Sequence, residues 1–403
     1  MIKRNSIFKI VLTGGGSGGH VFPLISVLRE IKKISQEKNL SIEVIYIGPN
    51  DFTLDYFKKE GIEIKSLITG KIRRSFGLLD FLNNILDIFK VIIGIFQAFY
   101  YLFIIMPDLV LAKGGYGSFP VVFISTIFVI PIYLHESDSG PGLVNHLMAK
   151  FAKKIFISFE GAKNYFPSQK TKLVGNPIRE EIFYKEEEKA DKKSLRKFLG
   201  LDEKRPIITV LGGSLGAKNI NDLVLDALPR LISETEIIHQ TGALDFERVK
   251  REAEIVFREI IGSEINKKYY HPLPFIEESP SEKGQFNLKD VYFLSDLIVA
   301  RAGSGLIFEI ARSGKPAILI PLPWATEDHQ RKNAYEYSRS GAAVVIEEKN
   351  LQPNIFTELI FQIIKDEKKK QEMGQKAIEF SKPLAAKEIA EELISALIKD
   401  KNL

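Results

Sequence analysis

The chain has 403 residues, of which 45% are hydrophobic and 27% charged, and a formal net charge of +5. The length favours two or three domains of roughly 150 residues each, with ordinary globular cores. The modest charge suits an acidic membrane surface or phosphate-bearing ligands but does not indicate nucleic-acid binding, and the absence of cysteine excludes disulfides and thiolate metal sites and fits a reducing compartment.

The N-terminal residues do not predict a signal peptide, because Gly14 interrupts the apolar run that begins at Ile7. The most apolar stretch covers residues 91–106. It is shorter than the ~20 residues of a spanning helix, contains Gln97 and ends at Pro107. We therefore expect a buried core helix there, in a soluble protein.

Short β-rich runs alternate with helical patterns, which is typical of βαβ units around a parallel sheet. In the first part of the chain we expect strands within residues 7–14, 41–48, 108–115, 130–137 and 153–159. A break near Asn176 and a charged stretch follow, and the same rhythm then begins again. There we expect strands within residues 205–213, 235–242, 294–304, 315–323 and 341–348. The repetition predicts two Rossmann-like α/β domains, residues 1–178 and 179–380. We also expect a C-terminal helix in residues 381–403 that packs back on the first domain.

The first strand runs into a glycine-rich stretch, TGGGSGGH, at residues 13–20. Gly14, Gly16 and Gly19 fit the G-x-G-x-x-G pattern of dinucleotide sites, and His20 excludes a Walker A loop. His20 falls in the first turn of the next helix, where the helix dipole favours a neutral imidazole that can act as a general base. The alternative is a histidine that only caps or packs.

The second part of the chain carries its polar motifs where strands are expected to end. Gly212-Gly213-Ser214 opens a helix whose N–H groups can bind a phosphate, or simply turns the chain and caps the helix. Glu309, after a further glycine loop, can accept two ribose hydroxyls, or is a surface carboxylate. Gln330 and Asn333 offer amides that suit a sugar, although the stretch around them can also just start a helix.

The chain has no D-x-D pair and no metal-ligand spacing of His, Asp or Glu. We therefore expect no metal and no cofactor. The charge of a phosphate ligand would be met by helix N-termini, hydroxyl groups and Arg179.

Eight motifs occur in a characteristic order: TGGGSGGHVFP, KGGYGSFP, HESDSGPGLVN, GNPIR, GGSLGA, HQTG, RAGSGLIFE and DHQRKNA. Through them almost the whole chain resembles the MurG family, the bacterial UDP-N-acetylglucosamine transferases of glycosyltransferase family 28 that make the lipid-linked peptidoglycan precursor. The resemblance implies the GT-B fold, in which two Rossmann-like domains face each other across a cleft. The second domain would hold most of the donor nucleotide.

The resemblance also implies roles for individual residues. His20 would be the catalytic base, with Glu136 as the other candidate. Substrate-binding residues would be Ser17, Gly18, Gly19, Asp138, Asn145, Arg179, Ser214, Ile276, Glu309, Gln330 and Asn333, most of them for the donor UDP-N-acetylglucosamine. The loops facing the acceptor would contain Gly14, Gly15, Gly114, Gly115 and Tyr116. The family often has asparagine where Asp138 stands and glutamine where Leu215 stands.

The reaction that the resemblance implies is inverting transfer of N-acetylglucosamine to the 4-hydroxyl of the muramyl sugar of lipid I (undecaprenyl-diphospho-MurNAc-pentapeptide), giving lipid II. A related GT-B transferase that glycosylates diacylglycerol is the alternative. An oxidoreductase would need an acidic residue such as Asp51 for ribose, but it leaves Glu309 without a role. A non-catalytic sugar-nucleotide sensor would not need His20.

A basic cluster beside apolar residues lies at Lys71, Arg73, Arg74, Phe76 and Leu79. Such a cluster is attracted to anionic lipid, and its apolar side chains can insert. We expect peripheral docking on the cytoplasmic face of the inner membrane. The alternative is an amphipathic helix packed on its own sheet.

Overall fold

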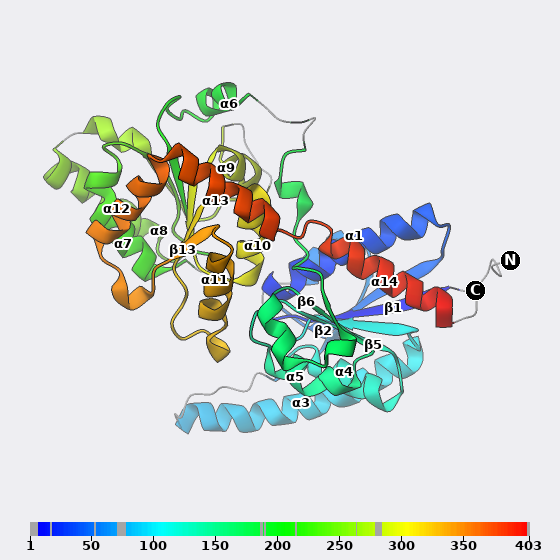
Figure 1. Cartoon of the computed structure of the whole chain (residues 1–403). Coiled ribbons are helices and arrows are strands. Elements are labelled where there is room, and N and C mark those ends of the chain that lie inside the picture. Colours follow the sequence, from blue (N-terminus) through cyan, green and yellow to red (C-terminus); the bar gives the residue numbers. More distant parts are fainter. Residues whose placement is uncertain are drawn as a thin grey trace. The chain divides into compact units, whose positions relative to one another are not determined.

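The computed structural model describes residues 7–16, 18–51, 54–70, 78–185, 188, 191–213, 216–262, 264–278 and 284–400. The chain forms two units: unit 1 comprises residues 1–179 and 382–403, and unit 2 comprises residues 180–381. Each unit is built on its own parallel β-sheet with helices on both faces (Figure 1). The expectation of two Rossmann-like α/β domains is thereby confirmed.

The sheet of unit 1 has seven parallel strands in the order β3-β2-β1-β4-β5-β6-β7. They are β1 (Phe8–Thr13), β2 (Ile42–Pro49), β3 (Glu63–Leu67), β4 (Leu109–Ala112), β5 (Ile132–Glu136), β6 (Lys154–Ile157) and β7 (Thr171–Leu173). The central strands are buried on both faces, which accounts for their continuous apolar sequences. The strand order reverses between β1 and β4, and at such a point loops leave room for a ligand at the carboxyl ends of the strands.

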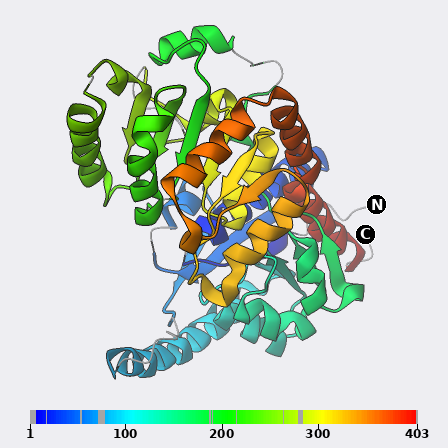
Figure 2. The same cartoon turned by 60° about the vertical axis from the view of Figure 1, so that its left-hand side comes forward.

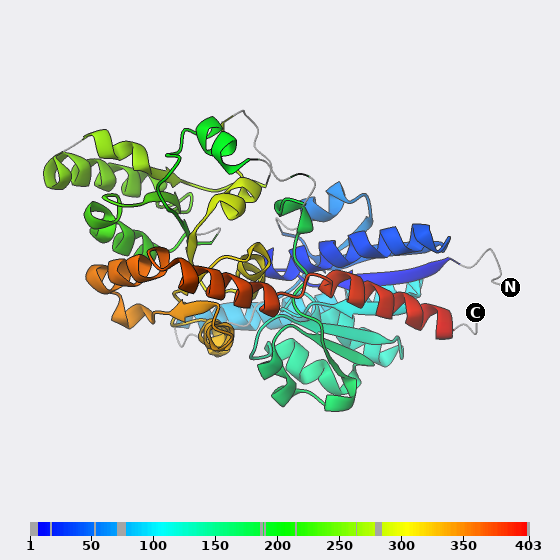
Figure 3. The ribbon, with the colours of Figure 1, turned by 45° about the horizontal axis from the view of Figure 1, so that its top comes forward.

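Helices cover both faces of this sheet. α1 (Gly18–Glu37), α2 (Leu54–Lys59) and α14 (Ala385–Asp400) share one apolar core, and α14 lies alongside α1 (Figure 3). α3 (Leu78–Ile105), α4 (Phe119–Ile127) and α5 (Leu143–Met148) cover the other face. The C-terminal helix is further held to unit 1 by ion pairs, since Glu388 lies 3.1 Å from Lys172 and Glu392 contacts Lys154.

Helix α3 corrects one expectation, that of a buried core helix over residues 91–106. It has 28 residues and extends past the end of the sheet (Figure 2). Its segment Asn83–Ile105 is long and apolar enough to cross a membrane, with a mean hydropathy of 2.1, yet only 22% of it is buried. The expectation was wrong because only one side of the helix, including Ala98 and Leu102, packs on the sheet.

The sheet of unit 2 has six parallel strands in the order β10-β9-β8-β11-β12-β13. They are β8 (Ile207–Leu211), β9 (Glu236–Gln240), β10 (Tyr270–Leu273), β11 (Leu297–Ala300), β12 (Ala317–Leu319) and β13 (Ala343–Val345). Its helices are α6 (Lys192–Phe198), α7 (Lys218–Leu231), α8 (Phe246–Ile255), α9 (Leu288–Leu294), α10 (Ser304–Ser313), α11 (His329–Arg339), α12 (Pro353–Ile364) and α13 (Glu367–Phe380). The order reverses between β8 and β11, as it does between β1 and β4 in unit 1.

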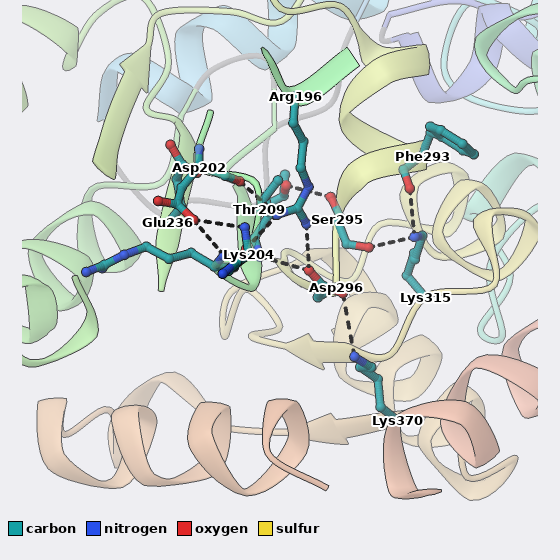
Figure 4. Close-up of polar contacts among 12 residues, drawn as sticks. Arg196, Asp202, Lys204, Thr209, Glu236, Phe293, Ser295, Asp296, Lys315 and Lys370 are labelled. Atoms are coloured by element: carbon teal, nitrogen blue, oxygen red, sulfur yellow. Dashed lines mark hydrogen bonds and ion pairs between the residues drawn. The ribbon is translucent and has the colours of Figure 1, made fainter. Parts of the chain in front are cut away.

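A polar network connects the amino ends of strands β8, β11 and β12 in unit 2 (Figure 4). Asp296 Oδ2 accepts the backbone N–H of Ile207 at 2.9 Å, and its carboxylate also pairs with Arg196 and Lys370. The ammonium of Lys315 donates to two backbone carbonyls, those of Phe293 and Ser295. The network ties the ends of β8, β11 and β12 together, so the opposite, carboxyl edge of the sheet carries the candidate site.

Candidate active site

The glycine loop after β1 forms a tight turn that is held by residues of the neighbouring strand. Gly15 and Gly16 have φ of +128° and +92°, which a residue with a side chain rarely adopts. The Tyr46 hydroxyl donates to the carbonyl of Gly14 at 2.9 Å, and the N–H of Gly16 donates to Asp51 Oδ2 at 3.1 Å. Asp51 thus supports the loop within unit 1. Ser17, predicted to contact the donor sugar, lies outside the described residues.

The second predicted acceptor loop, after β4, lies against the first. A Cβ atom on Gly115 would be 3.0 Å from the carbonyl oxygen of Gly15 and 3.3 Å from Nε2 of His20. A Cβ atom on Gly16 would be 2.5 Å from the ring of Tyr116. Only glycine permits approaches this close, because a side chain would collide with the opposite loop. The structure therefore brings both loops and His20 together.

His20 is the third residue of α1 and is partly exposed. Its position in the first turn places the ring at the positive end of the helix dipole, which disfavours an imidazolium. Gly18 and Gly19, which precede it, begin the helix and leave its first N–H groups without intrahelical acceptors. The arrangement is suited to a neutral base, and the assignment of His20 as that base stays a prediction.

Glu136, the other catalytic candidate, ends β5 and is buried. Its Oε1 accepts the N–H of Asp138 at 3.0 Å, and its Oε2 accepts the N–H of Gly142 at 3.0 Å and the side-chain amide of Asn145 at 2.9 Å. Burial is the main cause that raises the pKa of Glu136. With both oxygens engaged in shaping the following turn, this geometry favours a positioning role over that of a base.

Arg179 is the last residue of the first segment of unit 1. Its guanidinium lies 4.3 Å from the ring centroid of Phe22 on α1, and Ser26 of the same helix donates to the carbonyl of Ile178 at 2.9 Å. The segment that carries Arg179 is thus fixed on α1. Ser214, predicted to hold the diphosphate together with Arg179, lies outside the described residues, so this pairing stays a prediction.

In unit 2, Gln240 at the end of β9 links two predicted contact regions. Its Nε2 donates to the carbonyl of Gly213 at 3.0 Å, and its Oε1 accepts the N–H of Ile276 at 3.3 Å. Ile276 is fully buried, and its N–H is already engaged within the fold. Gln240 lies in the HQTG motif, but no role was predicted for it, because a glutamine at a strand end does not by itself indicate these backbone contacts.

Glu309 lies on α10, which follows the glycine loop after β11. Its side chain is 9% exposed, and the hydroxyl of Tyr292 donates to its Oε2 at 2.9 Å. Tyr292 comes from α9 and is itself buried. The alternative of a surface carboxylate is thereby excluded. Tyr292 is a second residue that sequence reasoning missed, because an isolated tyrosine on an apolar helix face is typical of a core.

Gln330 and Asn333 lie in the first half of α11, which confirms that a helix starts there. Gln330 Oε1 accepts the N–H of Leu322 at 3.0 Å, and the buried amide of Asn333 donates to the carbonyl of Ala302 at 3.4 Å. Just before the helix, Glu327 and Asp328 adopt φ of +53° and +56°. Strain of about 1–3 kcal/mol per such residue persists only where the surroundings impose it and is common at functional sites.

Among the described residues, no three His, Asp or Glu side chains gather as a metal site. The described polar groups of the site are instead backbone N–H groups, amides and carboxylates at the carboxyl edges of the two sheets. Backbone N–H groups at helix starts bind anions, and amides and carboxylates hydrogen-bond hydroxyls. In chemical terms, each edge is suited to a ligand that carries phosphates and sugar hydroxyls.

Comparisons with known proteins agree with this chemistry. The glycosyltransferase family 28 N-terminal domain matches residues 10–157, and the C-terminal domain of that family matches residues 207–389. A protein of Bacillus cereus, UDP-N-acetylglucosamine--N-acetylmuramyl-(pentapeptide) pyrophosphoryl-undecaprenol N-acetylglucosamine transferase 2, is 36% identical over 85% of this chain and 88% of its own. The transferase from Acetivibrio thermocellus is 32% identical over 98% of this chain and 99% of its own.

Solved structures show the same fold. Acinetobacter baumannii MurG superposes with a TM-score of 0.71 at 24% identity, covering 96% of this chain and 99% of that one. A UDP-GlcNAc 2-epimerase from Neisseria meningitidis, bound to UDP-GlcNAc, superposes with a TM-score of 0.63 at 16% identity over 96% and 99% of the two chains. Since a transferase and an epimerase share this architecture, the fold alone does not fix the reaction.

Proposed function

The chain belongs to glycosyltransferase family 28, and from this premise we propose that it transfers N-acetylglucosamine from UDP-N-acetylglucosamine to lipid I, giving lipid II. The observation that carries the proposal is the buried Glu309, held by Tyr292 after a glycine loop within the segment that matches the family's C-terminal domain. A buried, oriented carboxylate suits a pair of ribose hydroxyls. The curated relatives name the muramyl-pentapeptide acceptor, which supports it over diacylglycerol.

We propose a direct displacement that inverts the anomeric configuration. The 4-hydroxyl of the acceptor's muramyl sugar attacks the anomeric carbon, the bond from that carbon to the diphosphate oxygen breaks, and UDP leaves with the electron pair. His20 takes the hydroxyl proton, and the product is β-1,4-linked. The engagement of Glu136 in its own turn supports a single base and no covalent sugar–enzyme intermediate.

In this proposal unit 2 binds the donor. Glu309 holds the ribose, Ile276 lies at the uracil, and Gln330 and Asn333 reach the sugar hydroxyls. Ser214 and Arg179 hold the diphosphate. In unit 1, the contacting glycine loops at Gly15 and Gly115 bind the acceptor beside His20, and no cofactor takes part. The close approach of these loops to each other and to His20 supports the assignment.

We further propose that unit 1 docks on the cytoplasmic face of the inner membrane as a peripheral protein. Exposed apolar residues recur on α3 at intervals of three and four and so form one stripe: Leu86, Phe89, Ile93, Phe96, Tyr100 and Phe103. The opposite side of α3 packs on β1, β2 and β4, and the helix connects β3 to β4 of one sheet. These contacts favour a helix that lies on the bilayer over one that crosses it.

The basic cluster predicted to attract anionic lipid lies next to this stripe in the sequence. Lys71, Arg73, Arg74 and Phe76 lie outside the described residues, and so does the side chain of Leu79. The docking proposal therefore uses them as sequence features only. Cations beside an apolar helix face are the usual combination of surface-binding helices.

The proposed reaction is tested with the purified protein, radiolabelled UDP-N-acetylglucosamine, and vesicles that contain either lipid I or diacylglycerol. We expect label only in the lipid I product, and NMR of that product should show a β-glycosidic linkage. Label in diacylglycerol would establish the alternative transferase. Binding of UDP-N-acetylglucosamine without transfer to either lipid would establish a sensor.

A further inference from the structure

Lys113, the residue directly after β4, is buried, which is unusual for a lysine. Its side chain is 1% exposed, and its ammonium makes no hydrogen bond to any group in the described part of the chain. Burial lowers the pKa of Lys113 to about 8, so the side chain is still mostly protonated at neutral pH. A buried charge without a hydrogen-bond partner destabilises the folded protein unless an opposite charge lies nearby.

The neighbouring strand β5 ends in an opposite charge, Glu136. Strands β4 and β5 are neighbours, and Ala112 pairs with Leu134, so Lys113 and Glu136 both lie at the carboxyl edge of the sheet. Glu136 and Asp138 favour the charged form of Lys113. Burial and the charge of Asp138 raise the pKa of Glu136, and Lys113 opposes both effects by lowering it. The two groups are thus a buried pair that interacts by charge without a direct hydrogen bond.

A buried histidine shares this environment. Burial holds the pKa of His135 well below its ordinary range, and the charge of Lys113 lowers it further. His135 is therefore neutral and adds no charge beside Glu136. The charged groups that act on Glu136 are Lys113 and Asp138.

The charge state of Glu136 determines which hydrogen bonds it can accept from the backbone of the site. As a carboxylate it accepts three hydrogen bonds, from the N–H groups of Asp138 and Gly142 and from the amide of Asn145. The amide of Asn145 in turn abuts the second glycine loop, since a Cβ atom on Gly114 would be 2.8 Å from its Nδ2. A protonated Glu136 would present an O–H to one of these donors and lose that hydrogen bond.

We propose that Lys113 is a positioning residue of the transfer reaction: its buried ammonium holds Glu136 as a carboxylate, and Glu136 fixes the 137–142 turn and the glycine loop at Gly114. Only the kinetic consequences of this assignment rest on the proposed function. Lys113 acts through Glu136, and the effect reaches the loop that lies against His20.

The test is the variant Lys113→Met, which keeps the length of the side chain and removes the charge. We expect it to fold but to be less stable than the wild type at neutral pH, because the buried carboxylate of Glu136 loses its opposite charge. We also expect kcat/KM for lipid I to fall about tenfold or more through misplacement of the loop. The affinity for UDP should not change, and the acid limb of the pH–activity profile should move to higher pH, because Glu136 then protonates more readily.

A double-variant cycle identifies Glu136 as the link. In Glu136→Gln the side chain cannot ionise, so adding Lys113→Met should cause little further loss and no movement of the acid limb. Amide hydrogen exchange measured by mass spectrometry should rise over residues 137–142 in both single variants. The matched control is Lys315→Met, another buried lysine, which lies in the polar network at the opposite edge of the unit 2 sheet (Figure 4) and should leave kcat/KM unchanged.

Three results would overturn the proposal. One is an unchanged pH profile in an active Lys113→Met protein. Another is an equal loss from Lys113→Met with and without Glu136→Gln. The third is unaltered exchange over residues 137–142. If the wild type transfers sugar to no lipid, the proposed function fails by itself, whereas the exchange measurement still decides whether Lys113 and Glu136 hold the turn.

Discussion

The hydroxyl of Tyr292 donates to Glu309 Oε2 at 2.9 Å, and both side chains are buried in unit 2. The two residues come from different helices, α9 and α10, so the contact fixes the carboxylate relative to the glycine loop that precedes α10. An acceptor that is already oriented binds hydroxyls without losing further side-chain entropy. Glu309 is therefore prepared for a ligand before one arrives.

Replacing Glu309 with alanine should weaken UDP-N-acetylglucosamine and UDP alike, because the ribose belongs to both. The loss should be about 1–3 kcal/mol, the range for a buried group that loses its partner. Tyr292→Phe should weaken both ligands less, by about 0.5–1.5 kcal/mol, because it removes only the group that orients the carboxylate. Calorimetric titration measures both, with Glu372→Ala on the exposed side of α13 as the control. An unchanged UDP affinity in Glu309→Ala would remove this residue from the ribose site.

His20→Ala should lower kcat by ~10²–10⁴, the usual contribution of a general base, and leave UDP affinity nearly intact. Steady-state assays with lipid I and calorimetry with UDP separate the two effects. The matched control is His146→Ala, an exposed histidine on α5 of the same unit, which should remain fully active. Full activity of His20→Ala would assign the proton to another group.

The strands that the sequence did not reveal share a physical cause. β3 and β7 are the two edges of the unit 1 sheet, and β10 is an edge of the unit 2 sheet. These edge strands are partly solvated, so they lack the continuous apolar run of a central parallel strand, which the edge strand β13 (AVV) still has. β3 carries Glu63 and Lys65, and β10 contains Pro272, which a central strand would not tolerate. The central strands, buried on both faces, were predicted.

The residues of the candidate site also fall into two groups, those that the sequence predicted and those that only the folded structure reveals. Glycine loops stand out in the sequence because they follow apolar strand patterns, and Glu309 stands out because its helix follows such a loop. Their supports do not stand out, since Gly16 and Asp51, or Gln240 and Ile276, meet only after the chain has folded. The environment of Lys113 is hidden for the same reason. From its sequence context, a lysine before two glycines is expected to be an exposed cation. Lys113 is buried because β4 packs against its neighbours.

The stability of unit 2 should depend on pH through Lys315. Burial lowers the pKa of Lys315 to about 7 from an ordinary 10.5. Between these two values the unfolded chain binds a proton that the folded chain does not, so the free energy of unfolding rises with pH. Relative to Lys315→Met, the wild type should gain up to about 1.4 kcal/mol per pH unit above pH 7. Urea unfolding at pH 7, 8 and 9 measures the difference.

The control for this effect is Lys368→Met, which removes a lysine that is 87% exposed on α13. Its difference from the wild type should be nearly constant over the same pH range. A constant difference for Lys315→Met as well would mean that the Lys315 ammonium stays protonated in the folded protein. The hydrogen bonds to the carbonyls of Phe293 and Ser295 would then outweigh desolvation.

Membrane docking makes a prediction that combines the described stripe with the cluster before it. Phe96 and Phe103 are 72% and 65% exposed on α3. Changing both to glutamine keeps helix propensity and removes the apolar surface that would insert into lipid. Sedimentation with vesicles that contain anionic lipid should show weaker binding at every salt concentration. Transfer to lipid I in a bilayer should fall, whereas transfer to a water-soluble acceptor analogue should not.

Arg73→Glu together with Arg74→Glu tests the electrostatic part of the same proposal. Charge attraction is screened by salt, so this pair should weaken vesicle binding most at low ionic strength and little at high. Ile355→Gln is the matched control, since it removes an exposed apolar side chain from α12 of unit 2 and should leave vesicle binding unchanged. If the Phe96 and Phe103 variant binds vesicles as well as the wild type does, the α3 stripe is not the lipid-binding face. An equal loss at all salt concentrations for the arginine pair would show that these residues act through structure and not through charge.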